Sequence, residues 1–272
     1  MPTDSKNAII GQDELLARIN SYTIDTLPHA ILLEGDVGCG KHTLCKYMGE
    51  RFNLEVQELK DNSERKDLDE IVFNPYPTLY IIDFVGVIPK FQNSILKILE
   101  EPPASSFFVC LCTSRKFILP TIQNRCVVMS FAKYKREILE LFAWEYDEML
   151  AEIALTLYDT PGELLRNKGQ PLDKIYGLAI DVLNRIGHAS YPNVLSISEK
   201  IAFKNEKSKF DLITFIKALK VEAFNRVMDS NDELNYKMYR AIVDMEKNVR
   251  MCISKQRAFE GSLFELKRLV CN

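Results

Sequence analysis

Three short apolar runs in the first half of the chain predict the strands of a buried sheet. They are HAILLE at 29–34, TLYIID at 78–83 and FFVCLC at 107–112. Each is apolar over most of its length instead of alternating with polar residues, which is typical of parallel strands covered on both faces. Helical spacing follows the first run and returns over 92–101. We therefore expect an α/β fold with a parallel sheet over residues 1–132.

Helical periodicity replaces the strand pattern beyond about Lys133. Turn-forming residues interrupt it at Thr160-Pro161-Gly162, at 167–171 and near Pro192. A chain of 272 residues has room for more than one domain. The pattern predicts a small helical domain over 133–170 and a second, larger helical domain over 171–272.

Composition and charge exclude several classes of protein. The net charge is −3, so the chain is not a strongly basic protein that binds nucleic acid through bulk electrostatics. It contains no run of about 18 apolar residues, and the polar N-terminus does not resemble a secretory signal. We therefore expect a cytoplasmic protein without a membrane partner.

The cysteines and histidines do not predict a metal site. Seven cysteines are scattered through apolar segments, which indicates reduced thiols instead of a disulfide framework. The chain has no CxxC pair, and its three histidines lie far apart in the sequence. Cys110 and Cys112 are two residues apart in a predicted strand, so we expect them to share one buried face.

The stretch GDVGCGKHT between the first strand and the following helix nearly matches a phosphate-binding loop. Gly35, Gly40 and Lys41 fit the GxxxxGK pattern, in which backbone N–H groups surround the phosphates and the lysine reaches the terminal ones. The next position normally supplies a hydroxyl to Mg²⁺ but is His42, and imidazole is a poor ligand for this hard cation. Thr43 lies about 100° further round the helix, so its hydroxyl is not a direct substitute.

The second predicted strand carries another departure from a working hydrolase. It ends in Asp83, where phosphate-loop hydrolases place an acid that holds Mg²⁺. The next residue, often a glutamate that activates water, is Phe84. Two departures at one reaction centre predict that ATP or ADP binding is weak or absent, that no cofactor is required and that the chain does not hydrolyse ATP. An active ATPase with an unusual magnesium site remains the alternative.

Several motifs together carry a family resemblance. They are IIGQ at 9–12, QNSILKILEEPP at 92–103 and LPTIQNRC at 119–126. This combination resembles the AAA+ sliding-clamp-loader subunits of bacterial DNA polymerase III. It is most similar to the delta-prime subunits, which commonly have a defective phosphate loop, whereas gamma/tau subunits keep intact loops. Residues 247–264 resemble the end of the delta-prime collar helices, and only the middle, about 171–235, rests on helical pattern alone.

The resemblance implies an architecture and a role. Residues 1–132 would be an AAA+ domain with a degenerate phosphate loop, 133–170 a helical lid, and 171–272 a helical collar for oligomerisation. The chain would be a non-hydrolysing stator of the clamp loader. Its partners would be gamma/tau-like ATPases and a delta-like subunit and, through the complex, the sliding clamp and primer–template DNA. An AAA+ module outside replication is a further possibility.

The resemblance also assigns residues. Asn124-Arg125-Cys126 occupies the place of the family's Ser-Arg-Cys motif, so Arg125 would be an arginine finger acting in trans, although an isolated arginine is more often a surface residue. Thr113 would be a polar sensor or simply a turn residue, and the second sensor arginine would be missing, with Glu163 near its place. The vestigial nucleotide site would comprise Gly35, Gly38, Gly40, Lys41, Thr43, Asp83 and Thr113. The zinc module that often follows the loop in relatives would be absent.

Overall fold

The computed structural model describes residues 9–59, 71–84, 89–144, 146–202, 211–230, 232–252 and 254–271. The chain divides into two compact units. The first comprises Met1–Leu139 with Thr160–Glu163, and the second comprises Glu140–Asp159 with Leu164–Asn272. The three-part division at residues 132 and 170 stays a prediction.

The first unit is built on a sheet of five parallel strands, which confirms the expected fold class. The strands are β1 Ala30–Glu34, β2 Glu55–Leu59, β3 Thr78–Asp83, β4 Ser106–Cys112 and β5 Val127–Ser130. Their order in the sheet is β2-β3-β4-β1-β5. Because all strands run the same way, Glu34, Asp83 and Ser130 end at one carboxyl edge.

The sequence pattern missed the two edge strands. In β2 only Val56 and Leu59 are half-buried and the other residues are exposed, so this strand lacks the apolar character of the central ones. In β5 only Met129 is fully buried. Edge strands are covered less completely than central strands, and their composition therefore signals a strand less clearly.

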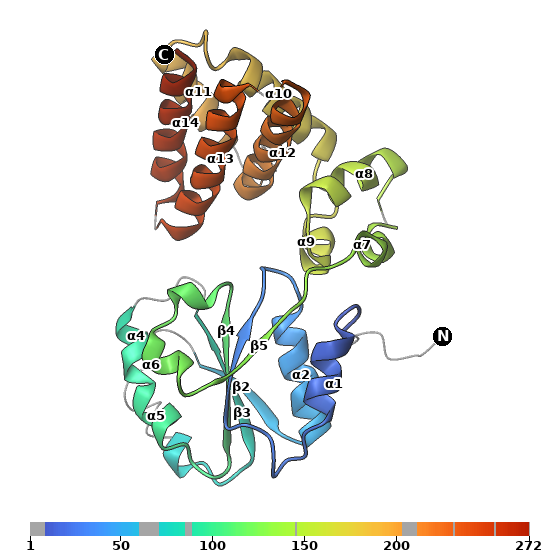
Figure 1. Cartoon of the computed structure of the whole chain (residues 1–272), viewed down its shortest axis with the longest axis vertical. Helices are drawn as coiled ribbons and strands as arrows, with labels where there is room; N and C mark the ends of the chain where they lie inside the picture. Colours follow the sequence, from blue (N-terminus) through green and yellow to red (C-terminus); the bar gives the residue numbers. More distant parts are fainter. Residues whose placement is uncertain are drawn as a thin grey trace. The chain divides into compact units, whose positions relative to one another are not determined.

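Helices cover both faces of the sheet (Figure 1). α1 Asp13–Asn20 and α2 Lys41–Phe52 share one hydrophobic core with the sheet, and α4 Pro89–Ser94, α5 Leu96–Glu100 and α6 Pro120–Gln123 share the other. Successive residues of β1 point to opposite faces, so Leu33 joins the first core and Leu32 the second. Cys110 and Cys112 both lie in the second core, as expected.

The helical segment at 92–101 is two helices instead of the single one expected. α4 ends at Ser94 and α5 begins at Leu96, with the buried Ile95 between them. The buried Gln92 side chain donates to the Phe117 carbonyl at 3.2 Å and accepts from the Leu119 N–H at 2.9 Å. These hydrogen bonds hold α4 against the segment before α6. Helical periodicity does not predict them, because they join residues far apart in the sequence.

The second unit contains helices and, among its described residues, no strand. Its helices are α8 Glu148–Leu157, α10 Leu172–Arg185, α11 Tyr191–Ala202, α12 Leu212–Ser230, α13 Glu233–Met251 and α14 Lys255–Cys271. α7 Arg136–Ala143 and α9 Pro161–Arg166 each run from one unit into the other. α12 packs against α10 and α13, and α14 packs against α13 and α11 (Figure 1). Its helices agree with the helical periodicity found beyond about Lys133.

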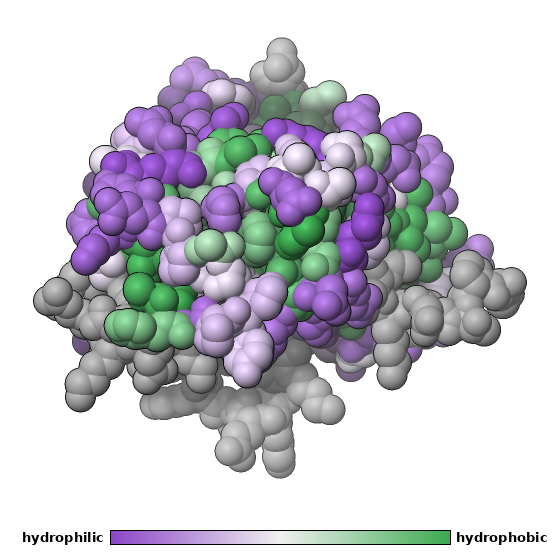
Figure 2. Space-filling view, turned by 90° about the horizontal axis from the view of Figure 1, so that it is seen from below, coloured by the Kyte–Doolittle hydropathy of each residue, from purple (hydrophilic) through white to green (hydrophobic). Residues whose placement is uncertain are grey.

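The surface is mixed in character. On the face drawn in Figure 2, hydrophilic side chains surround separate hydrophobic patches. No helix within the described ranges is both long enough and apolar enough to cross a bilayer.

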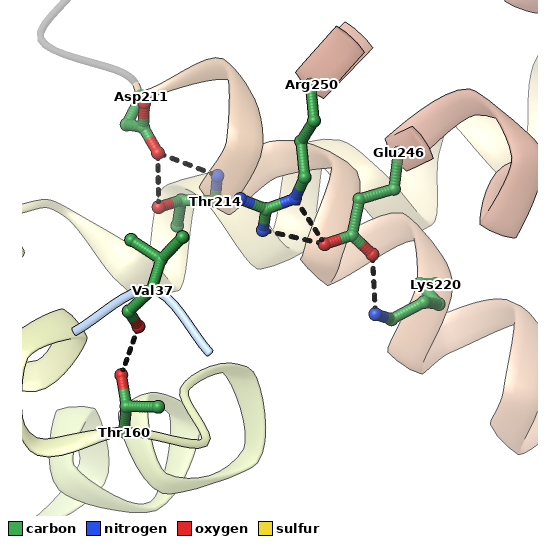
Figure 3. A network of polar contacts seen from close by, with 7 residues as sticks. All are labelled: Val37, Thr160, Asp211, Thr214, Lys220, Glu246 and Arg250. Carbon is green, nitrogen blue, oxygen red and sulfur yellow. Dashed lines mark hydrogen bonds and ion pairs between the residues drawn. The ribbon is translucent and has the colours of Figure 1, made fainter. Parts of the chain in front are cut away.

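A largely buried carboxylate joins α12 to α13 in the second unit (Figure 3). Glu246 accepts hydrogen bonds from Lys220 Nζ at 2.6 Å and from Arg250 Nη2 at 2.8 Å, and its side chain is only 14% exposed. Burial alone would raise the pKa of Glu246, but the hydrogen bonds and positive charges of Lys220 and Arg250 outweigh it. Its pKa therefore lies below the ordinary value of 4.5.

The contacts of Glu246 with Lys220 and Arg250 predict that the folded protein loses stability as the pH falls. A carboxyl group whose pKa is lowered by folding stabilises the protein above its ordinary pKa, and this contribution disappears as the pH falls through the lowered value. Glu246→Gln should reduce the free energy of unfolding at neutral pH by roughly 1 to 3 kcal/mol. The difference from the unmodified chain should shrink below pH 4.5. Urea denaturation across this range, with the exposed Asp229→Asn as control, measures both effects, and a pH-independent difference would contradict the assignment.

Candidate functional site

The phosphate-loop sequence forms the connection between β1 and α2. Gly38 has φ 83° and Gly40 has φ 104°, a left-handed backbone region that side chains other than glycine rarely adopt. Gly40 is the N-cap of α2. The first N–H groups of a helix have no intrahelical acceptor, so this end of α2 is favourable for an anion. The loop therefore keeps the backbone form of a phosphate site.

Lys41 is turned toward the loop itself. Its side-chain Nζ donates to the Gly35 carbonyl at 2.6 Å and to the Asp36 carbonyl at 2.9 Å, and the residue is only 7% exposed. These two carbonyl oxygens compensate the buried ammonium group. A bound phosphate would have to replace these contacts before Lys41 could reach it.

Distant residues of the first unit hold the next three loop carbonyls. The Thr160 hydroxyl donates to Val37 O at 2.8 Å (Figure 3), the Gly162 N–H donates to Gly38 O at 2.9 Å, and the Tyr134 hydroxyl donates to Cys39 O at 2.7 Å. The loop is thus fixed from inside by its lysine and from outside by the segment at 160–162 and by Tyr134.

Sequence reasoning did not identify these supporting residues. It interpreted 160–162 only as a break between helices and gave Tyr134 no role. The signal available in the sequence was Gly162 itself, because a glycine at a break in the helical pattern suggests a close backbone approach. The structure supplies the partner: a Cβ at Gly162 would lie 2.7 Å from Gly38 O and 2.8 Å from Gly38 Cα.

The magnesium side of the site carries an imidazole. His42 Nε2 lies 3.5 Å from Asp83 Oδ2, and both side chains are partly exposed. The structure therefore brings the two residues together where a hydroxyl and a carboxylate would hold Mg²⁺. Thr43 is half-buried in the first turn of α2, and Thr113 is half-buried just after β4, at the same sheet edge as Asp83.

The position of a water-activating base is part of the core. Phe84 is 6% exposed and belongs to the core beneath α4 and α5. Glu34, a second carboxylate at this edge, already accepts from the Arg115 N–H at 3.0 Å and from the Ser130 hydroxyl at 3.3 Å. Neither residue is a suitable base for hydrolysis.

Burial disfavours the thiolate form of the two cysteines near the loop. Burial raises the pKa of Cys39, although Lys41 partly opposes this effect, and burial raises the pKa of Cys45 to about 12. Both thiols are therefore protonated at neutral pH. Among the described residues no three His, Cys, Asp or Glu side chains are grouped to hold a metal ion. At the loop, His42 offers an imidazole nitrogen where Mg²⁺ prefers an oxygen ligand.

Arg125 lies away from this loop, between α6 and β5. Its Nη1 donates to the Thr121 carbonyl at 2.6 Å, and its Nη2 forms an ion pair with Glu100 Oε1. The side chains of Arg125 and Glu100 are 31% and 47% exposed. The guanidinium is therefore held in one orientation at the surface of the first unit.

Comparison with known proteins agrees with this architecture. A family model described as DNA polymerase III, delta subunit, matches residues 77–135, the segment that contains Asp83, Thr113 and Arg125. A solved structure, a DNA polymerase III gamma subunit-related protein from Thermotoga maritima, has a TM-score of 0.53 at 15% identity and covers 95% of this chain and 99% of its own. This likeness shows the fold.

Curated relatives are distant in sequence. DNA polymerase III subunit gamma of Buchnera aphidicola subsp. Schizaphis graminum is 25% identical over 250 residues, which cover 76% of this chain and 66% of that protein. The Replication factor C small subunit of Methanococcus maripaludis is 27% identical over 149 residues, 48% of this chain and 47% of that protein. The chain spans about two thirds or less of the relatives it matches. Residues 77–135 are thus similar to the DNA polymerase III delta subunit family.

The close approach of Gly162 to Gly38 gives a testable prediction. Gly162→Ala would place a methyl group against backbone atoms that cannot move freely, and it should lower the free energy of unfolding by about 1 to 3 kcal/mol. The control is Gly177→Ala in α10, where an added Cβ meets nothing within 4 Å and should stabilise the helix by roughly 0.5 to 1 kcal/mol. Denaturant unfolding measures both. An unchanged or more stable Gly162→Ala protein would contradict the described contact.

Proposed function

We propose that this chain is a delta-prime-like clamp-loader subunit of the DNA polymerase III type, which does not hydrolyse ATP and presents Arg125 to a neighbouring ATPase subunit. The observation that carries the proposal is that one chain combines an altered phosphate loop with an arginine held at the surface away from that loop. The loop has the wrong side chain for Mg²⁺ at His42 and a core residue at Phe84, while Arg125 is held at the surface in the motif position.

Arg125 would act on a phosphoryl group bound by the neighbour. A guanidinium is planar, always charged and able to donate two parallel hydrogen bonds, so it stabilises charge that develops on a transferring phosphoryl group. The loop of this chain would serve as structure, with Lys41 bonded to its own carbonyls. The proposed partners are gamma/tau-like ATPases, a delta-like subunit and, through the complex, the sliding clamp and primer–template DNA.

An active gamma/tau-like ATPase is the second candidate. The gamma relatives and the intact GxxxxGK pattern with Lys41 favour it. In this case the Lys41 side chain would exchange its carbonyl partners for phosphate oxygens. Hydrolysis by the purified chain separates the two candidates, because the proposed stator has no turnover of its own.

We expect the isolated chain to bind Mg-ATP weakly or not at all. His42 offers a nitrogen where Mg²⁺ prefers oxygen, and the loop carbonyls already engage Lys41. Isothermal titration calorimetry measures binding, and phosphate release in the presence of DNA measures turnover. His42→Ser should not restore turnover, since Phe84 still occupies the position of the base. Tight, magnesium-dependent binding followed by hydrolysis would favour the second candidate.

Arg125→Ala should damage the partner's activity and leave this subunit folded. Arginine fingers supplied by one chain to another contribute roughly 10³ to 10⁵ in rate. The measurement is DNA- and clamp-stimulated ATP hydrolysis by the reconstituted complex. Arg125→Lys should also fail, because a point charge does not reproduce a planar fork.

The stability of the isolated variant serves as the control. Arg125 is at the surface, and its ion pair with the half-exposed Glu100 is worth less than about 1 kcal/mol. Thermal unfolding of Arg125→Ala should therefore shift only slightly. Unchanged hydrolysis by a fully assembled Arg125→Ala complex would remove the finger role.

A further inference from the structure

Two protein groups orient the Arg125 guanidinium from different sides. Thr121 in α6 accepts from Nη1 through its carbonyl, and Glu100 at the end of α5 accepts from Nη2 through Oε1. Each terminal nitrogen thus has one acceptor. A guanidinium carries five N–H donors, and those not used by Thr121 and Glu100 stay in the same rigid plane. The partly exposed fork is therefore oriented but still able to bind an anion.

The two acceptors come from helices that the core fixes in place. Ile98 and Leu99 anchor α5, and Ile122 anchors α6, in the same hydrophobic core. Glu101 is the C-cap of α5, and Pro102 and Pro103 after it cannot continue a helix, so α5 ends at Glu100. The position of the carboxylate is therefore as well determined as the helix that carries it.

We infer that Glu100 is the positioning residue of the arginine finger, an inference that rests on the function proposed for Arg125. With the Thr121 carbonyl as its only partner, the Arg125 side chain would sample more rotamers, and only some of them would aim the fork correctly. Glu100 reduces this freedom before the neighbour's phosphate arrives. Because the pair is partly solvated, a phosphate with its greater negative charge competes for the guanidinium without a large penalty.

The test uses variants of Glu100 in the reconstituted complex. Glu100→Ala should lower kcat for stimulated ATP hydrolysis by up to about 5-fold, far less than the loss in Arg125→Ala, because the partly exposed pair that orients the finger is weak. The KM for ATP should change less than about 2-fold, since the finger acts mainly in the transition state. Glu100→Gln keeps an oxygen acceptor and the same shape, so it should recover part of the lost rate. The matched control is the exposed neighbour Glu101, and Glu101→Gln should leave kcat unchanged.

A double-mutant cycle separates positioning from a general structural role. If Glu100 acts through Arg125, then Glu100→Ala should have no further effect in an Arg125→Ala background. An equal loss of rate in both backgrounds would overturn the inference, as would a raised kcat in Glu100→Gln, which would mean that the pair restrains the finger. If Arg125→Ala abolishes stimulation but Glu100→Ala does not lower kcat, only the positioning role fails. If Arg125→Ala itself has no effect, the proposed function fails as well.

Discussion

Parallel pairing of β1 with β4 and β5 is the constraint on which the rest of the first unit depends. This pairing brings the ends of strands that are far apart in sequence to one carboxyl edge of the sheet. The loop after β1, Asp83 at the end of β3, and Thr113 just beyond β4 lie at this edge because β3 also pairs in parallel with β4. The apolar residues that alternate between the two sheet faces keep the edge in place, because each face has its own core and covering helices.

At this edge the chain keeps the backbone form of a phosphate loop, with His42 and Phe84 at the positions where phosphate-loop hydrolases carry a hydroxyl and often an acid. The loop's glycines and the start of α2 retain the required backbone form. Lys41 and the donors at Tyr134, Thr160 and Gly162 satisfy five consecutive carbonyls from within the chain. The bonds of Thr160 and Gly162 tie the segment at 160–162 to the loop after β1.

Burial decides how differently the ion pairs of two carboxylates, Glu246 and Glu100, behave. Glu246 is largely buried and held by two cations, so its pairs lower its pKa and contribute to stability. Glu100 and Arg125 are partly exposed, and water screens their attraction. The exposed pair can exchange partners at little cost, whereas the contacts of the largely buried Glu246 are suited to holding helices together.

The sequence by itself determined the features that depend on local pattern. Apolar runs gave β1, β3 and β4, helical periodicity gave the later helical unit, and GxxxxGK gave the loop and the start of α2. Only the tertiary structure decided the edge strands β2 and β5, the division of 92–101 into two helices, and the partners of Arg125 and of the loop carbonyls. The physical reason is that periodicity and backbone restrictions act between neighbours in the sequence. Hydrogen bonds such as those of Thr160 with Val37, or Arg125 with Glu100, join residues that approach each other only after the strands have paired.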